Sequence, residues 1–265
     1  KIPLSCFNFG WFWQSNNSIS TRIKKANKAH NCATFSCCIT SFKNYYDSLD
    51  LELIRDADVF IKEQSTGRKI AFRYLEATRS YRPNPTERAR VGETYQLNVT
   101  WKGQVFQSEG LMLEPPIVDS VVWNYEEKRL FRDEGYFIKV YGKIPFLENN
   151  YYRIRVIEND TLYNQPEDYL LFDDAFGLQV FEKGLELGYA FKKNDRIRLE
   201  LYRLNKDVFD YLSQLVNLLF NDGGLFSPPP QNPKSNIKVV KGNSQVLGLF
   251  MVSPVLSRTI VISSN

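Results

Sequence analysis

The chain has 265 residues, enough for one large domain or two ordinary ones, and its 43% hydrophobic and 24% charged residues exclude an intrinsically disordered protein. It contains a single histidine, His30, which excludes histidine-based catalysis and metal binding from almost all of the sequence. The net charge of +4, without a basic run interleaved with aromatic residues, indicates no nucleic-acid partner.

The amino-terminal segment combines two expected strands, residues 4–9 and 18–25, with a cluster of large aromatic residues between them. Trp11, Phe12 and Trp13 lie beside glycine, glutamine, serine and asparagine residues, which are typical of a loop. Since neighbouring side chains cannot all point into one core, we expect at least one of the three to be exposed or to contact a partner or ligand. In the alternative interpretation, the first strand extends through the cluster with Phe12 facing outward.

All four cysteines fall within the first 38 residues, close to His30. A disulfide of Cys32 with Cys37 or Cys38 is favoured if the compartment is oxidising, and buried free thiols are the alternative. The adjacent Cys37 and Cys38 cannot easily present both sulfur atoms to one tetrahedral ion, so we expect no metal site and no cofactor here.

Alternation of hydrophobic and polar residues predicts antiparallel strands in the first half of the chain. The clearest strand covers residues 94–101, and its hydrophobic side chains share one face: Tyr95, Leu97, Val99 and Trp101. Lys102-Gly103 is typical of a two-residue turn that leads into residues 104–107, as in a hairpin. With further strands expected at 57–64 and 68–74, we predict an immunoglobulin-like β-sandwich over residues 1–114.

Pro115 and Pro116 mark the expected domain boundary, because prolines donate no hydrogen bond to a sheet. Beyond them, residues 117–265 are predicted to form a second antiparallel β domain. Its expected strands cover residues 119–125, 137–142, 151–158, 196–203, 246–253 and 259–262.

One helix is predicted over about residues 206–220, within the second domain. Asn205 is a suitable N-cap, Asp207 lies in the first turn, and Gly223 follows the end as a C-cap. The expected inward stripe consists of Val208, Leu212, Leu215 and Leu219, with help from Tyr211 and Leu218.

No catalytic constellation is found in the sequence. The acidic turn at Asp173-Asp174, with Asp168 nearby, has the oxygen ligands that calcium prefers, but a solvated β-turn closed by Gly177 is the favoured interpretation. Carboxylates are abundant, yet no pair stands out as the acid and base of a glycosidase.

The second half of the chain resembles the domain of unknown function 4249 family. The resemblance rests on segments in a fixed order: Asn150 to Val156, Asp173 to Gly177, Asn194 to Leu201, Tyr211-Leu212, Pro228-Pro229, Ser235 to Ile237 and Leu247 to Phe250. The first half also fits, through residues 57–61, 91–95 and the Pro115-Pro116 boundary. Residues 10–47 fit poorly, so the family lends no role to the aromatic cluster or the cysteines.

The resemblance implies a lipoprotein of the outer membrane of Bacteroidota, with a signal peptide and an acylated cysteine upstream of Lys1. It also implies cell-surface exposure and association with a TonB-dependent β-barrel transporter. We therefore expect a non-catalytic accessory protein that helps such a transporter to capture or gate a nutrient. The rival interpretations are a structural subunit of a larger outer-membrane secretion or assembly complex and, third, a carbohydrate-binding or carbohydrate-active protein.

Overall fold

The computed structural model describes residues 4–5, 8–14, 39–41, 52–143, 150–174, 180–220 and 231–263. Side chains are described for residues 39, 53–143, 150–174, 181–220 and 231–263. No helix in these ranges is long and apolar enough to cross a bilayer.

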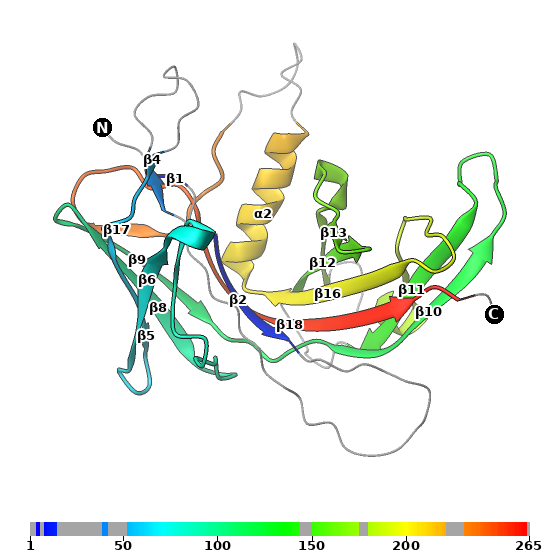
Figure 1. Cartoon of the computed structure of the whole chain (residues 1–265), viewed down its shortest axis with the longest axis horizontal. Coiled ribbons are helices and arrows are strands. Elements are labelled where there is room, and N and C mark those ends of the chain that lie inside the picture. Colours follow the sequence, from blue (N-terminus) through cyan, green and yellow to red (C-terminus); the bar gives the residue numbers. More distant parts are fainter. Residues whose placement is uncertain are drawn as a thin grey trace, which may run out of the picture. The chain divides into compact units, whose positions relative to one another are not determined.

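The described residues are mainly β, in antiparallel sheets, as the sequence predicts (Figure 1). The helical elements are η1 (Glu76–Thr78), η2 (Pro166–Asp168), α1 (Val180–Lys183) and α2 (Lys206–Leu219). A short sheet near the amino terminus joins β1 (Leu4–Ser5), β3 (Thr40–Ser41) and β4 (Glu52–Leu53).

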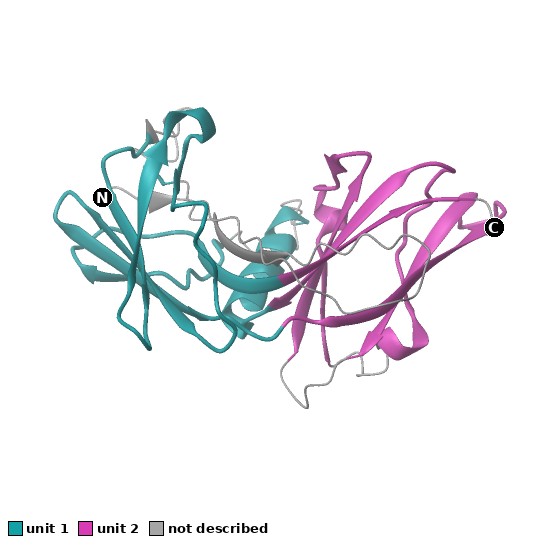
Figure 2. Ribbon diagram, turned by 60° about the horizontal axis from the view of Figure 1, so that its bottom comes forward, with its two compact units in different colours: residues 1–13, 31–114, 204–254 teal, residues 14–30, 115–203, 255–265 magenta. Residues whose placement is uncertain are grey.

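The chain divides into two compact units (Figure 2). Unit 1 takes residues 1–13, 31–114 and 204–254, and unit 2 takes residues 14–30, 115–203 and 255–265. The division at Glu114 and Pro115 coincides with the expected boundary. Residues 204–254, however, belong with the first half of the chain, whereas the sequence analysis placed them in a domain of residues 117–265.

The main sheet of unit 1 is antiparallel, and the central β8–β9 hairpin has the predicted geometry. In the described residues its strands run in the order β17 (Lys238–Lys241), β9 (Gln104–Leu111), β8 (Thr94–Trp101), β5 (Asp58–Glu63), β6 (Lys69–Leu75) and β7 (Ser80–Arg82). Lys102 and Gly103 form the turn with φ of 46° and 75°, as a primed hairpin turn requires. The four hydrophobic residues of β8 predicted to share a face are all buried.

Pairing across a long sequence separation explains why residues 204–254 belong to unit 1. Strand β17 adds to the edge of β9, with Lys238 opposite Gln107. The Asn205 side-chain amide donates to the carbonyls of Leu111 and Val252, at 3.0 and 2.9 Å. Ile237 is buried in the same hydrophobic core as the strands of the first half.

Unit 2 contains a larger and a smaller antiparallel sheet. In the described residues, the larger one runs in the order β13 (Thr161–Leu162), β12 (Tyr151–Glu158), β16 (Arg196–Leu204), β18 (Leu249–Val261) and β2 (Asn8–Gln14), and β14 (Leu170–Asp173) pairs with β12. The smaller one joins β10 (Ile117–Glu126), β11 (Gly135–Lys143) and β15 (Leu185–Glu186). Of this larger sheet, all of β2 except Gln14, residues 249–254 of β18 and Leu204 of β16 belong to unit 1.

The core of unit 2 follows the predicted alternation. Tyr152, Ile154 and Val156 of β12 are buried, as are the three inward residues expected in β16, which are Ile197, Leu199 and Leu201. Aromatic rings pack on Tyr152 of β12. Its ring is stacked on that of Phe172, with the ring centroids 5.4 Å apart, and makes an edge-to-face contact with the ring of Phe181.

The prediction for the closing strands requires correction. The two closing strands expected at 246–253 and 259–262 are one continuous strand, β18, which runs through Pro254. Its Val255–Val261 half is hydrogen-bonded to β16 from Tyr202 to Arg196, and this pairing carries the strand across the residues expected to interrupt it.

Helix α2 forms where it was predicted and follows the predicted N-cap, but its carboxy-terminal cap and its buried stripe differ from expectation. Asn205 is the N-cap, as predicted, but its side chain makes no capping hydrogen bond; its amide nitrogen donates instead to the carbonyls of Leu111 and Val252. Phe220 is the C-cap, and Gly223 lies outside the described residues. Of the predicted stripe only Val208 and Leu212 are buried, whereas Leu219 is 47% exposed.

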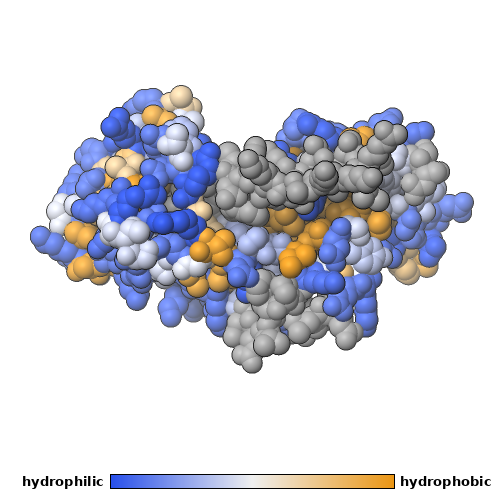
Figure 3. Space-filling view, turned by 90° about the horizontal axis from the view of Figure 1, so that it is seen from below, coloured by the Kyte–Doolittle hydropathy of each residue, from blue (hydrophilic) through white to orange (hydrophobic). Residues whose placement is uncertain are grey.

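The described surface is largely hydrophilic. On the face seen in Figure 3, hydrophilic side chains predominate and hydrophobic ones form several separate groups. Single exposed hydrophobic residues are normal on a soluble surface, so only a strongly exposed cluster indicates an interaction site.

Candidate ligand-binding site

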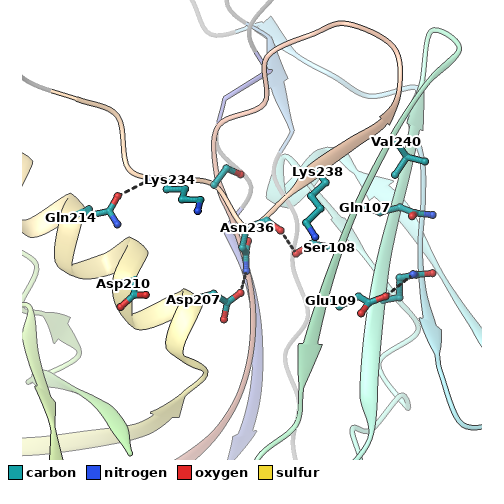
Figure 4. A pocket seen from close by; sticks show the side chains of 12 residues that line it. Gln107, Ser108, Glu109, Asp207, Asp210, Gln214, Lys234, Asn236, Lys238 and Val240 are labelled. Carbon is teal, nitrogen blue, oxygen red and sulfur yellow. Dashed lines mark hydrogen bonds between the residues drawn. The ribbon is translucent and has the colours of Figure 1, made fainter. Parts of the chain in front are cut away.

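Unit 1 contains a polar cleft of about 570 Å³ between α2, the edge of β9 and the segment that leads into β17 (Figure 4). We call it the unit 1 cleft. The residues that line it are Gln96, Gln107, Ser108, Glu109, Asp207, Asp210, Gln214, Lys234, Ser235, Asn236, Lys238 and Val240. This volume lies in the range of small-molecule sites, although such sites usually have more apolar walls.

Asn236 holds the three sides of the cleft together. Its side-chain amide donates to Asp207 at 2.7 Å and to the Phe250 carbonyl at 2.8 Å. Its side-chain carbonyl accepts the Phe250 N–H at 2.8 Å, and its backbone carbonyl accepts the Ser108 hydroxyl at 2.8 Å. Because these groups are bonded to one another, the wall around Asn236 is preorganised rather than adaptable.

The cleft offers charged groups of both signs on different elements. Asp207 and Asp210 lie on the first turns of α2, and Glu109 lies on β9. Lys234 lies on the segment that leads into β17, Lys238 is the first residue of β17, and both are exposed. A ligand that carries both an anionic and a cationic group would be met by complementary charges.

Amide groups fix the positions of two further parts of the wall. The Gln214 side chain accepts the Lys234 N–H at 2.9 Å and so ties α2 to the incoming segment. The Gln96 amide donates to Glu109 at 2.9 Å across the β8–β9 pair. The carboxylate of Glu109 is thereby held at the edge of the cleft.

The serine hydroxyls of the described lining are occupied by structural hydrogen bonds. The two hydroxyls are engaged with backbone carbonyls, Ser108 with Asn236 and Ser235 with Gly248. No described lining residue is a histidine or a cysteine, so a serine would have no neighbouring imidazole base. The described lining also contains no aromatic ring on which a sugar could stack.

Comparison with known protein families gives one match. The family described as a domain of unknown function (DUF4249) matches residues 31–259, which is most of the chain. This protein belongs to the DUF4249 family. The resemblance noted in the sequence is thus confirmed, and no curated protein matches the chain.

The DUF4249 match also changes one expectation about the amino-terminal segment. Residues 10–47 were expected to fit the family poorly, but the match begins at residue 31 and includes the positions of Cys32, Cys37 and Cys38. The aromatic cluster stays outside the matched range. His30 and the four cysteines lie outside the described residues, so the disulfide and the free-thiol alternatives both stay predictions.

The backbone of the aromatic cluster lies within a strand of this DUF4249 protein. Trp11, Phe12 and Trp13 are part of β2, which pairs with β18. This agrees with the alternative in which the strand extends through the cluster, not with a loop. Their side chains are outside the described residues, so their role as a partner or ligand contact stays a prediction.

The acidic turn considered for calcium uses its carboxylates for local hydrogen bonds. Asp168 accepts the Gln165 N–H at 2.8 Å and the Tyr189 hydroxyl at 2.9 Å. Asp174 accepts the Asn150 N–H at 3.1 Å, and Gly177 lies outside the described residues. In the part of the chain that the structure describes, no three potential metal ligands form a group.

The buried carboxylate of Glu63 in this DUF4249 chain has a lowered pKa because it is bonded to two arginines. Glu63 is fully buried and bonds to Arg68 at 2.8 Å, to Arg90 at 2.6 Å and to the Thr66 hydroxyl at 2.7 Å. The hydrogen bond from Arg68 is the main cause that lowers the pKa of Glu63 to about 2, against the opposing effect of burial. Such a permanently charged group braces the β5–β6 turn and is unsuited to proton transfer.

An apolar cleft of about 270 Å³ lies within unit 2, lined mainly by residues of β14 and by residues 185–188. Its one described charged residue, Glu186, is paired with Arg132 at 2.7 Å and Lys139 at 3.3 Å. Ligand sites usually combine apolar walls with a few converging polar groups, which this lining lacks.

Sequence patterns did not reveal the unit 1 cleft. Its residues come from β8, β9, α2 and the segment before β17, which are up to 144 positions apart, since Gln96 and Val240 both contribute. The sequence contains one signal for this cleft, the polar run Lys234-Ser235-Asn236 that follows the proline-rich segment. Three consecutive polar side chains do not fit a half-buried strand and indicate a loop.

Proposed function

We propose that this DUF4249 protein is a non-catalytic binding and interaction protein of the outer membrane, lipid-anchored, that works with a TonB-dependent β-barrel transporter in nutrient capture or gating. The membrane and the transporter come from the family resemblance. The ligand-binding part is supported by the unit 1 cleft, in which carboxylates of α2 and β9 and ammonium groups of the intervening segment converge.

The composition of the cleft indicates a small, polar, zwitterionic ligand, such as an amino acid or a short peptide. Carboxylates on α2 and β9, with ammonium groups on the chain between these elements, would fix its orientation, and the Asn236 network provides a rigid wall against which it can lie. A carbohydrate ligand, which is the third interpretation, would find hydrogen-bonding groups but no aromatic platform among the described lining residues.

The ligand part is tested by calorimetry of the purified chain against amino acids, short peptides, oligosaccharides and nucleotides. Loss of one charge-assisted contact through Lys238→Ala should weaken binding of the true ligand by about tenfold or more. Lys241→Ala is the matched control, because Lys241 is an exposed lysine of the same strand outside the cleft lining. Equal weakening by both variants, or no binding in any class, would contradict the assignment.

The partner part is tested in native membranes. Affinity purification after cross-linking should recover a large β-barrel protein, and purification as a solitary monomer would count against it. Deletion of the gene separates the leading proposal from the structural-subunit alternative. Loss of uptake of one nutrient supports an accessory to transport, whereas a broad loss of surface proteins supports a subunit of a secretion or assembly complex.

A further inference from the structure

The β10–β11 hairpin of unit 2 presents two large hydrophobic side chains at its tip. Leu130 is 88% exposed and Phe131 is 96% exposed, the two highest values among the large hydrophobic residues that the structure describes. Figure 1 shows the hairpin, in green, ending in a tip that projects beyond its strands. Burial of these two side chains would remove more apolar surface from water than burial of the adjacent exposed pair Leu219 and Phe220, which are 47% and 54% exposed.

The position of the pair is unusual for a turn. Arg129 and Arg132 exchange two backbone hydrogen bonds, at 2.9 and 3.3 Å, so Leu130 and Phe131 are the two central residues of a tight turn. Neither has a positive φ. Hairpin turns prefer asparagine, aspartate or glycine with positive φ, because that twist matches the strands. Neither turn propensity nor burial in the chain therefore explains these two residues.

Charged side chains hold the base of the tip in place. Arg132 pairs with Glu186 at 2.7 Å and with Glu126 at 3.8 Å, and its guanidinium lies 3.6 Å from the ring centre of Phe137. Arg129 adds a second contact to Glu126 at 3.5 Å. A braced tip loses little conformational freedom on binding, which increases affinity.

The charges around the tip favour a protein over a membrane as the binding partner. Four acidic and three basic residues surround the pair, namely Glu126, Glu127, Asp133 and Glu134 with Lys128, Arg129 and Arg132. An anionic lipid surface would repel the acidic majority, whereas membrane-binding segments are rich in lysine and arginine. A hydrophobic centre within a rim of mixed charge is the usual composition of a protein interface.

We infer that Leu130 and Phe131 form an anchor that inserts into an apolar pocket of a partner protein whose rim carries charges of both signs. The inference rests on the interaction part of the proposed function and names the surface that carries it. It is independent of the unit 1 cleft and of what that cleft binds.

The test places a photoreactive phenylalanine analogue at position 131 of the full-length protein in its native cells, with the same analogue at position 91 as control. Val91 is also an exposed apolar residue in a turn, 47% exposed. The expected result is one protein adduct from position 131 and none from position 91. The captured protein is then purified and its affinity for the chain is measured.

A double variant separates binding from folding. Leu130→Asn with Phe131→Gly introduces the preferred hairpin turn and should leave the melting temperature unchanged or raised, while affinity for the captured protein falls by about a hundredfold or more. Leu130→Ser with Phe131→Ser, which adds no turn preference, should weaken binding equally, and Val91→Ser should not.

Three results would overturn the inference. One is unchanged affinity of both double variants; another is an adduct of twice the chain mass, which would indicate a second copy. The third is tip-dependent sedimentation with vesicles of anionic phospholipid in the absence of protein, which would indicate a membrane. If the captured protein is not a β-barrel, the inference stands and the transporter proposal fails. If a barrel is recovered equally by the tip variants, the transporter proposal stands and the inference fails.

Discussion

At the scale of single residues, two polar groups of unit 1 make several hydrogen bonds each, the buried carboxylate of Glu63 and the partly buried amide of Asn236. Glu63 carries a full set of charged and hydroxyl partners, and Asn236 joins α2, β9 and β18. Burial of such groups costs free energy unless every hydrogen bond is satisfied. Both should therefore be sensitive to substitution.

Glu63 should make the stability of unit 1 depend on pH in acid. Its folded-state pKa of about 2 lies below the ordinary value of 4.5, so its contribution is fully present above pH 4.5 and is lost as the pH falls towards 2. The shift corresponds to about 2–3 kcal/mol after allowance for the two half-exposed arginines. Urea unfolding between about pH 6 and about pH 2.5 should show this loss for the wild type and a flatter dependence for Glu63→Gln.

Asn236 should be the most sensitive residue of the unit 1 cleft. Asn236→Ala leaves the Phe250 N–H and the Asp207 carboxylate without their partner, and we expect a loss of about 1–3 kcal/mol in the free energy of unfolding. Gln214→Ala, which removes one bond from an exposed side chain, should cost less than about 1 kcal/mol. Equal costs in denaturant unfolding would show that Asn236 does not organise the wall.

At the scale of elements, strands could be predicted where hydrophobic and polar residues alternate and where residues typical of a turn follow. The β8–β9 hairpin was located from Tyr95, Leu97, Val99 and Trp101 together with the Lys102-Gly103 turn. The continuity of β18 was not, because Pro254 is a local signal for interruption, whereas the pairing with β16 is a non-local contact. The two hydrogen bonds of the Asn205 amide were unpredictable for the same reason, since their acceptors lie 94 and 47 positions away in the sequence.

The turn of the β8–β9 hairpin gives a test of backbone strain without side-chain crowding. Gly103 has φ of 75°, and an added Cβ would meet nothing within 4 Å, so Gly103→Ala should cost about 1 kcal/mol through conformation alone. Gly188→Ala is the control, because its Cβ is equally uncrowded and its φ lies outside the left-handed region. A melting temperature lowered equally by both substitutions would exclude backbone conformation as the cause.

At the scale of the whole molecule, the sequence indicated two β-rich parts and one of their boundaries. It did not indicate that residues 204–254 return to unit 1, because Lys238 opposite Gln107 is a pairing of distant residues that no local pattern encodes. The unit 1 cleft was missed for the same reason, since it exists only once α2 and β17 have joined β9.

The assignment of Phe250 to unit 1 can be tested by hydrogen exchange. Phe250→Ala should cost about 3–5 kcal/mol and reduce the protection of amides in β8 and β9, far away in the sequence, more than that of amides in β11 and β12. Leu201→Ala, in the core of unit 2, should show the reverse pattern. The opposite result, with Phe250→Ala affecting β12 first, would contradict the division into units.

The interrupted course of unit 1 along the chain has a consequence for its biosynthesis. Strand β9 is complete once Leu111 has been made, but β17, which pairs with it, ends at Lys241, about 130 residues later. At a synthesis rate of about 5–20 residues per second, the edge of β9 stays without its partner for roughly 7–26 s. A nascent chain with an open strand edge for that long is prone to aggregate, so folding of this protein should depend on a chaperone that shields β9 until β17 arrives.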